Sequence, residues 1–133
     1  MINMAMRYLD AKGKGEADYD LAHDILFFKV KNREYSRSLE ADNIVIDLDK
    51  EDFPMGMQIF GASEFLRVPK IALRNVQKWQ LEASVEGNKL EVRLLFTSSQ
   101  RNKIKEITPI IREQLKESLP NSEMILTAKA SKK

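Results

Sequence analysis

The sequence contains no cysteine, and this absence excludes several classes of function. Disulfides, thiol nucleophiles, cysteine-ligated zinc and iron–sulfur centres all require that residue. The five glycines are too scattered to form a phosphate-cradling loop. No window approaches 18 consecutive apolar residues, and the start of the chain lacks a basic segment followed by a long apolar one. We therefore expect no cofactor, no membrane partner and a cytoplasmic location.

The chain has 133 residues, 43% of them apolar, which is enough to bury one core without a metal or a disulfide. We expect a single domain over residues 1–127 and a disordered tail over residues 128–133. The net charge of +2 hides an asymmetry, because residues 1–66 carry −5 and residues 67–133 carry +7. The basic half could attract an anionic partner, pair with the acidic half or pair with a second copy of the chain.

Alternating apolar residues predict strands in the first half of the chain. Residues 24–31 are rich in isoleucine, leucine, phenylalanine and valine. Residues 43–49 also alternate, and a polar turn after them leads into residues 55–60. These segments predict a meander of antiparallel strands.

A clear hairpin pattern lies on either side of Gly87 and Asn88, a pair that suits a two-residue turn of type II′. Apolar and polar residues alternate before and after this pair, so residues whose numbers sum to 175 should face each other. Trp79 then lies opposite Phe96 on the apolar face of the hairpin. We expect Trp79 to point into the core.

Two further segments predict helices. Residues 62–67 suit a short connector helix that has Ser63 as its cap and that Pro69 limits. Near the C-terminus, Thr108 can cap a longer helix whose first position is Pro109. The apolar stripe of that helix would consist of Ile111, Leu115 and Leu119, with Pro120 as its stop.

Two segments around this C-terminal helix complete the prediction. Residues 98–107 suit either an extension of the helix or a break before it, and residues 124–127 predict a last short strand. The predicted fold class is α+β, an antiparallel sheet of meander and hairpin strands with a short connector helix and one C-terminal helix packed on it. Residues 64–127 supply the hairpin and the C-terminal helix.

Two groups of acidic residues suggest metal binding. On a helix, the spacing of Asp20, His23 and Asp24 would place two carboxylates and an imidazole on one face. The same residues are ordinary turn formers before a strand. The acidic run at 47–52 begins like a calcium-binding loop, but that loop needs Gly at its sixth position and Glu at its twelfth, where this chain has Asp and Gln. A solvated turn accounts for this run.

Basic residues in the second half suggest a nucleic-acid surface. Cations could neutralise phosphates, and the neighbouring Trp79 and Phe96 could stack on bases. The hairpin register argues against stacking, because it places both rings on the apolar face. The cations in question are Arg67, Lys70, Arg74, Lys78, Arg101, Lys103 and Lys105.

A series of spaced positions resembles a known family. These positions are Tyr19-Asp20, Asp24, Leu26-Phe27-Phe28, Tyr35, Ser38, Ile44-Val45-Ile46-Asp47, Gly56-Met57-Gln58-Ile59-Phe60 and Ala62-Ser63. Together they resemble the small bacterial and archaeal family called domain of unknown function 2283, whose members usually have Glu where this chain has Gln58. The resemblance covers residues 19–63 and implies a small antiparallel sheet followed by a short helix. It brings no established catalytic residues and suggests an antitoxin-like or regulatory binding role.

The sequence therefore predicts a non-enzymatic protein-interaction module. We expect self-association, with a dimer as the simplest form, because sheet edges need partners or protection and the two halves of the chain carry opposite charges. A small protein partner is also expected. Nucleic-acid binding through the basic half is the alternative, and an enzyme that uses Asp20, His23 and Asp24 is a third hypothesis.

Overall fold

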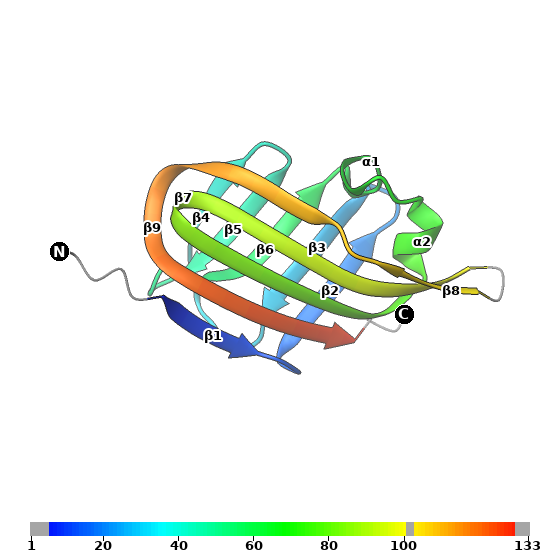
Figure 1. Cartoon of the computed structure of the whole chain (residues 1–133), viewed down its shortest axis with the longest axis horizontal. Coiled ribbons are helices and arrows are strands. Elements are labelled where there is room, and N and C mark those ends of the chain that lie inside the picture. The colour runs from blue at the N-terminus through cyan, green and yellow to red at the C-terminus, as the bar shows by residue number, and fades with distance from the viewer. Residues whose placement is uncertain (1–5, 101–102, 130–133) are drawn as a thin grey trace.

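The computed structural model describes residues 6–100 and 103–129, which fold into two β-sheets and two short helices (Figure 1). One sheet has five strands in the order β2-β3-β6-β5-β4, and each is antiparallel to its neighbours. The bounds of these strands are β2 Gly15–Asp20, β3 Ile25–Val30, β4 Tyr35–Ala41, β5 Ile44–Asp49 and β6 Pro54–Phe60. The strands predicted at 24–31, 43–49 and 55–60 are thus present, the second beginning at Ile44.

The second sheet has the order β1-β9-β7-β8. Its strands are β1 Arg7–Ala11, β7 Val76–Gln100, β8 Lys103–Ile107 and β9 Ile110–Lys129. β1 lies parallel to β9, whereas β7 is antiparallel to both β8 and β9. The strands of the two sheets cross in Figure 1, with one sheet in front of the other. This arrangement replaces the predicted single sheet.

The long strand β7 folds back on itself near its middle. Trp79 and Phe96 lie 17 residues apart, which in a straight strand would separate them by about 55 Å. Their ring centroids are 4.6 Å apart instead, and Figure 1 shows β7 reversing direction. Gly87 has a φ of 63°, as the first central residue of a type II′ turn requires, whereas Asn88 has no positive φ. The predicted hairpin at Gly87 and Asn88 is confirmed.

The strand β9 wraps around this hairpin. Residues 78–85 of β7 pair with residues 122–129 of β9, and residues 89–93 of β7 pair with residues 110–114. Figure 1 shows β9 curling around the reversal of β7. Each half of the β7 hairpin therefore pairs with one half of β9. The second half of β7 also pairs with β8, so β8 and the first half of β9 lie end to end along the same side of β7.

The predicted C-terminal helix is wrong, and with it the α+β fold class. The segment that follows Thr108 is the first half of β9. Ile111, Leu115 and Leu119 are nevertheless buried, with 5%, 3% and 5% of their surface exposed. A spacing of four residues is about one helical turn but also two full periods of a strand, so the pattern identified the buried residues without identifying the element.

The ends of the chain differ from the prediction as well. Residues 128 and 129, which were predicted to belong to a disordered tail, are the last two of β9, while residues 130–133 lie outside the described residues. The open segment 98–107 continues β7 and then forms β8, and the short strand predicted at 124–127 lies within β9.

The core lies between the two sheets. Trp79 is 2% exposed and lies edge-on to Phe28 of the other sheet, with ring centroids 5.4 Å apart. The predicted inward orientation of Trp79 is confirmed. Aromatic rings packed in this way contribute about 1 kcal/mol beyond the area they bury.

Two short helices connect the five-stranded sheet to β7. Helix α1 (Ala62–Leu66) is the predicted connector helix, but its N-cap is Gly61 rather than Ser63. Helix α2 (Lys70–Arg74) follows Pro69 and was not predicted. Among the described residues, no helix is long and apolar enough to cross a membrane.

Candidate functional site

The end of β7 and the whole of β8 form a projecting hairpin, which we call the arm (residues 96–100 and 103–107). Figure 1 shows it extending past α2, away from the rest of the sheet. Its base is anchored because the fully buried Ser98 hydroxyl donates a 2.8 Å hydrogen bond to the carbonyl oxygen of Ala72 in α2. Towards its tip, Lys103, Ile104 and Lys105 are all exposed.

The register of the arm decides which way its side chains point. Ser98 pairs with Lys105, and Ser99 pairs with Ile104. Paired residues share a face, and successive residues alternate between faces. Since Ser98 faces α2, Lys105 projects from the α2 side of the arm, and Ile104 projects from the other side. Ile104 is 78% exposed.

Helix α2 adds to the exposed charge at this end of the molecule. Ala72 and Leu73 are buried, whereas Lys70, Ile71 and Arg74 are exposed. We call α2 and the arm together the arm end. It offers lysine and arginine side chains from two elements that the Ser98 hydrogen bond holds together.

The predicted nucleic-acid residues are spread around the arm end. Lys70 and Arg74 lie in α2, and Lys103 and Lys105 lie in the arm. Lys78, near the start of β7, lies opposite Lys129. The remaining two are Arg67, the C-cap residue of α1, and Arg101, which lies outside the described residues.

These cations form no ion pair within the part of the chain that the structure describes. The residues in question are Arg67, Lys70, Arg74, Lys78, Lys103, Lys105 and Lys129. The positive charge of Lys70 attracts the Asp24 carboxylate at longer range and helps to lower its pKa. Exposed positive charge of this kind attracts anionic groups.

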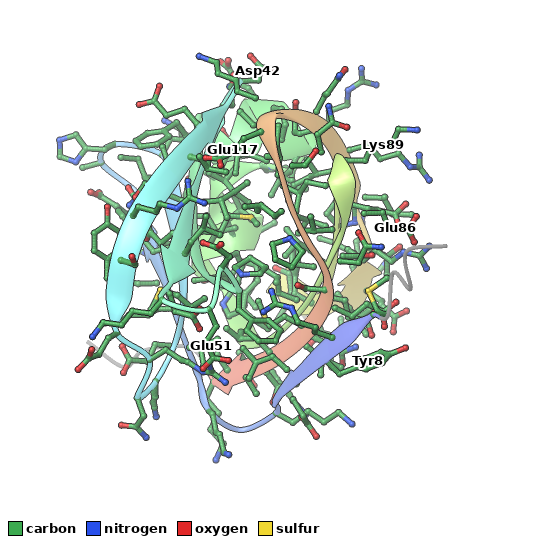
Figure 2. The ribbon with its side chains drawn as sticks, turned by 90° about the vertical axis from the view of Figure 1, so that its left-hand side faces the viewer. Tyr8, Asp42, Glu51, Glu86, Lys89 and Glu117 are labelled. Carbon is green, nitrogen blue, oxygen red and sulfur yellow. The ribbon has the colours of Figure 1, made fainter. Side chains whose placement is uncertain are left out.

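The opposite end of the molecule, which faces the viewer in Figure 2, is held by paired charges. We call it the ion-paired end, defined by Arg33, Arg37, Asp49, Asp52 and Glu117. Arg37 contacts Glu117 and lies 3.2 Å from Asp52, so it joins β4 to β9 and to the β5–β6 turn. Arg33 lies 2.9 Å from Asp49.

Asp49 shows that the acidic run at 47–52 is a turn. It is 3% exposed and accepts hydrogen bonds from the backbone N–H groups of Glu51 and Phe53 at 2.8 and 3.0 Å. Arg33 supplies the opposite charge. A second arginine, Arg7, stacks 4.1 Å above the Phe53 ring and donates to the Glu51 carbonyl oxygen. The turn prediction is confirmed here, since the carboxylate is already satisfied within the protein.

The three candidate metal ligands do not converge. His23 Nδ1 lies 2.8 Å from Asp20, and the hydrogen bond from His23 lowers the pKa of that carboxyl. Asp24 turns instead towards Tyr19 and Ser63. Among the described residues, no three histidine or acidic side chains are placed to share a metal ion. The predicted turn at this position is confirmed.

Asp24 caps helix α1 from a distant part of the chain. Its carboxylate accepts from the Ser63 hydroxyl at 2.6 Å, the Ser63 N–H at 3.0 Å and the Tyr19 hydroxyl at 2.6 Å. Burial alone would raise the pKa of the Asp24 carboxyl, but these hydrogen bonds outweigh it and lower the pKa. Burial and the bond to Asp24 raise the pKa of the Tyr19 hydroxyl above its usual range.

A second network lies on the outer face of the five-stranded sheet. The Ser38 hydroxyl donates to Asp47 at 2.7 Å and lies 2.7 Å from the Tyr35 hydroxyl. A Cβ on Gly56 would lie 3.1 Å from the carbonyl oxygen of Phe28 and 3.2 Å from an Asp47 carboxylate oxygen. A larger residue at position 56 would therefore require these neighbours to move slightly. Most of these residues belong to the spaced pattern noted in the sequence.

The sequence predicts the cations but not the arm that presents them. Residues 98–107 suit either a helix extension or a break, so the sequence predicts no role for Ser98 or Ile104. A signal was present, because the inward positions Val92, Leu94 and Phe96 continue at Ser98 with the same spacing of two. That regularity indicates that β7 extends past Phe96.

Comparisons with known proteins agree with part of this picture. One relative is a protein of Methanosarcina mazei named "Putative hypoxanthine phosphoribosyltransferase", which is 29% identical over 87 residues, or 65% of this chain and 71% of that protein. No solved structure matches the chain. Residues 17–63 match the model of the family described as protein of unknown function (DUF2283). The predicted resemblance is confirmed, and these residues form a DUF2283 segment.

Proposed function

We propose that the protein is a non-enzymatic interaction module that binds an anionic partner through its arm end. The observation that carries this proposal is the contrast in charge pairing. Arg33 and Arg37 form ion pairs with acidic side chains at the ion-paired end, whereas the cations of the arm end form no ion pair among the described residues. A protein partner is favoured because the arm also exposes Ile104, an aliphatic side chain that water solvates poorly.

A labelled polyglutamate chain provides the first test of this surface, with fluorescence anisotropy as the readout. We expect the triple variant Lys70→Gln, Lys103→Gln, Lys105→Gln to bind it roughly tenfold more weakly than the wild type, because each exposed charge contributes about 0.5 kcal/mol. Lys50→Gln is the control, since Lys50 is exposed but lies 2.9 Å from Glu34. Equal binding by the wild type and the triple variant would refute the proposed surface.

Nucleic-acid binding is the second candidate, and the same unpaired cations favour it. Stacking on Trp79 or Phe96 is not part of this candidate, because both rings are buried. A single-stranded oligonucleotide should then bind more tightly than polyglutamate at the same salt concentration, with a steep linear fall of log K against log salt. An oligonucleotide that binds no better than polyglutamate would remove the nucleic-acid candidate.

The transferase activity in the name of the Methanosarcina mazei relative is not part of our proposal. Many enzymes that hold phosphate groups use a glycine-rich loop or the N-terminus of a helix. In the described part of this chain both helices have five residues, and the glycines lie far apart in the sequence.

Self-association and an antitoxin-like or regulatory role stay predictions. Gel filtration with light scattering tests the first directly at micromolar concentration. A clean monomer would exclude the predicted dimer and leave the arm end available for a different partner.

A further inference from the structure

The outer edge of the arm has the features of a strand-addition site. We propose that this edge, with a hollow beside the start of β9, binds an extended peptide segment in which acidic and aliphatic residues alternate. This inference rests on the proposed function and names the chemistry of the partner.

The outer edge of β8 pairs with no other strand among the described residues. β8 pairs with β7 on one side and is the last strand of its sheet. Residues 110–114 of β9 pair with the same half of β7, so their outer edge lies in line with that of β8. Within the described ranges, no strand pairs with either outer edge. Backbone N–H and C=O groups on such an edge can pair with an added strand.

A hollow beside this edge could hold an added strand. This hollow of about 420 Å³ lies between α1 and β9. Its lining includes the consecutive residues 109–113, whose side chains point to both faces of the sheet, so the hollow follows the backbone edge of the strand. Phe65 and Arg67 form the other wall.

Basic and aliphatic residues alternate over residues 103–105 of β8, and the acidic Glu106 follows on the face of Ile104. Lys103 and Lys105 share one face of the strand, and Ile104 lies on the other. An added strand places its side chains directly opposite these residues. Acidic residues would then face the two lysines, and an aliphatic residue would face Ile104. The hollow beside the start of β9 is lined by two arginines, Arg67 and Arg112, and by one acidic residue, Glu113.

A second copy of β8 does not suit this edge. An antiparallel pairing centred on Ile104 places Lys103 opposite Lys105, and a pairing centred on Lys105 places two copies of Lys105 face to face. Lysines on an edge strand commonly prevent such self-pairing. The same lysines favour an acidic strand.

A nucleic acid would use only part of these features. Phosphates would contact the cations, but Ile104 projects from the opposite face of the arm and offers no planar surface for a base. The alternating peptide uses the cations, the isoleucine and the backbone edge together, which is why we favour it.

The test uses the full chain and three fluorescent probes: a peptide of alternating aspartate and valine, the same peptide with proline at two central positions, and a single-stranded oligonucleotide. We expect the uninterrupted peptide to bind roughly tenfold more tightly than the proline peptide, because proline removes backbone hydrogen bonds to β8. Ile104→Thr keeps a β-branched residue and should weaken peptide binding roughly fivefold through lost apolar contact, with oligonucleotide binding unchanged.

Each outcome of this test has one meaning. Equal binding of the two peptides would overturn strand addition, since charge alone would then account for the affinity. Oligonucleotide binding without peptide binding would also overturn it while leaving the arm end as a binding surface. If none of the three probes binds, both strand addition and the proposed function are wrong.

Discussion

The two ends of this molecule use similar charges in different ways. At the ion-paired end, Arg33 and Arg37 join turns and strands that are distant in sequence, and Asp49 is nearly fully buried. At the arm end, the cations project into solvent from a hairpin and a short helix. The paired charges of the ion-paired end stabilise the fold once both partners are in place. The exposed charges of the arm end contribute little to stability and are available to a ligand.

Removing Asp49 should produce the largest loss of stability. Asp49→Ala leaves Arg33 without its closest acidic partner and two turn N–H groups without an acceptor, and we expect it to lower the free energy of unfolding by about 3 kcal/mol. Urea unfolding measures this value. Lys105→Ala in the arm is the comparison and should change it by less than about 0.5 kcal/mol. Similar losses in both variants would contradict the distinction between the two ends.

Asp24→Asn should have the next largest effect, about 2 kcal/mol, because the cap of α1 loses its charge-assisted hydrogen bonds. The folded-state pKa of Asp24 is lowered, so its contribution is present above the ordinary carboxyl pKa and is lost as the pH falls through the lowered value. Unfolding curves of both proteins should therefore converge in acid. A constant difference down to low pH would show that the charge on Asp24 is unimportant.

A substitution in the turn of the β7 hairpin should have a smaller effect on stability. Gly87→Ala should destabilise the protein by about 1 kcal/mol, since a φ of 63° is unfavourable for alanine. A Cβ at this position has no atom within 4 Å, so the loss reports backbone strain alone. Thermal unfolding measures it, with Asn88→Ala as the neighbouring control. No change at Gly87 would argue against the turn.

Replacing Glu113, which lines the hollow beside β9, should have the smallest effect on stability. Unlike the other substitutions, it should stabilise the protein at neutral pH. Burial raises the pKa of the Glu113 carboxyl, and the negative charge of Asp42 raises it further. A raised pKa stabilises the fold at low pH, and this contribution is lost as the pH rises through the raised value. Glu113→Gln should therefore be slightly more stable than the wild type at neutral pH, with no gain in acid. Unfolding at two pH values tests this, and a gain that persists in acid would contradict it.

Local patterns predicted the hairpin at Gly87 and the buried Trp79, because both depend on alternation and on a two-residue turn. The strand β9 could not be predicted in the same way. The spacing of Ile111, Leu115 and Leu119 suits a helix and a strand equally, and Pro109 after Thr108 favours a helix start. Pairing with β7, which is distant in sequence, decided the outcome.

The candidate surface was predictable only in part. Its cations stand out in the composition of the second half of the chain. Which cations form ion pairs depends on contacts between distant parts of the chain, such as that of Arg37 with Glu117, which is 80 residues away. The hollow lined by Arg67 likewise requires α1 and β9 to meet. Long-range contacts of this kind leave no mark in a single sequence.

Hydrogen–deuterium exchange with and without the alternating aspartate–valine peptide tests the central claim most directly. We predict that the peptide slows exchange of the amides of β8 and of residues 110–113 and leaves exchange in the Asp49 turn unchanged. Protection confined to the ion-paired end, or to the outer faces of the sheets, would contradict it.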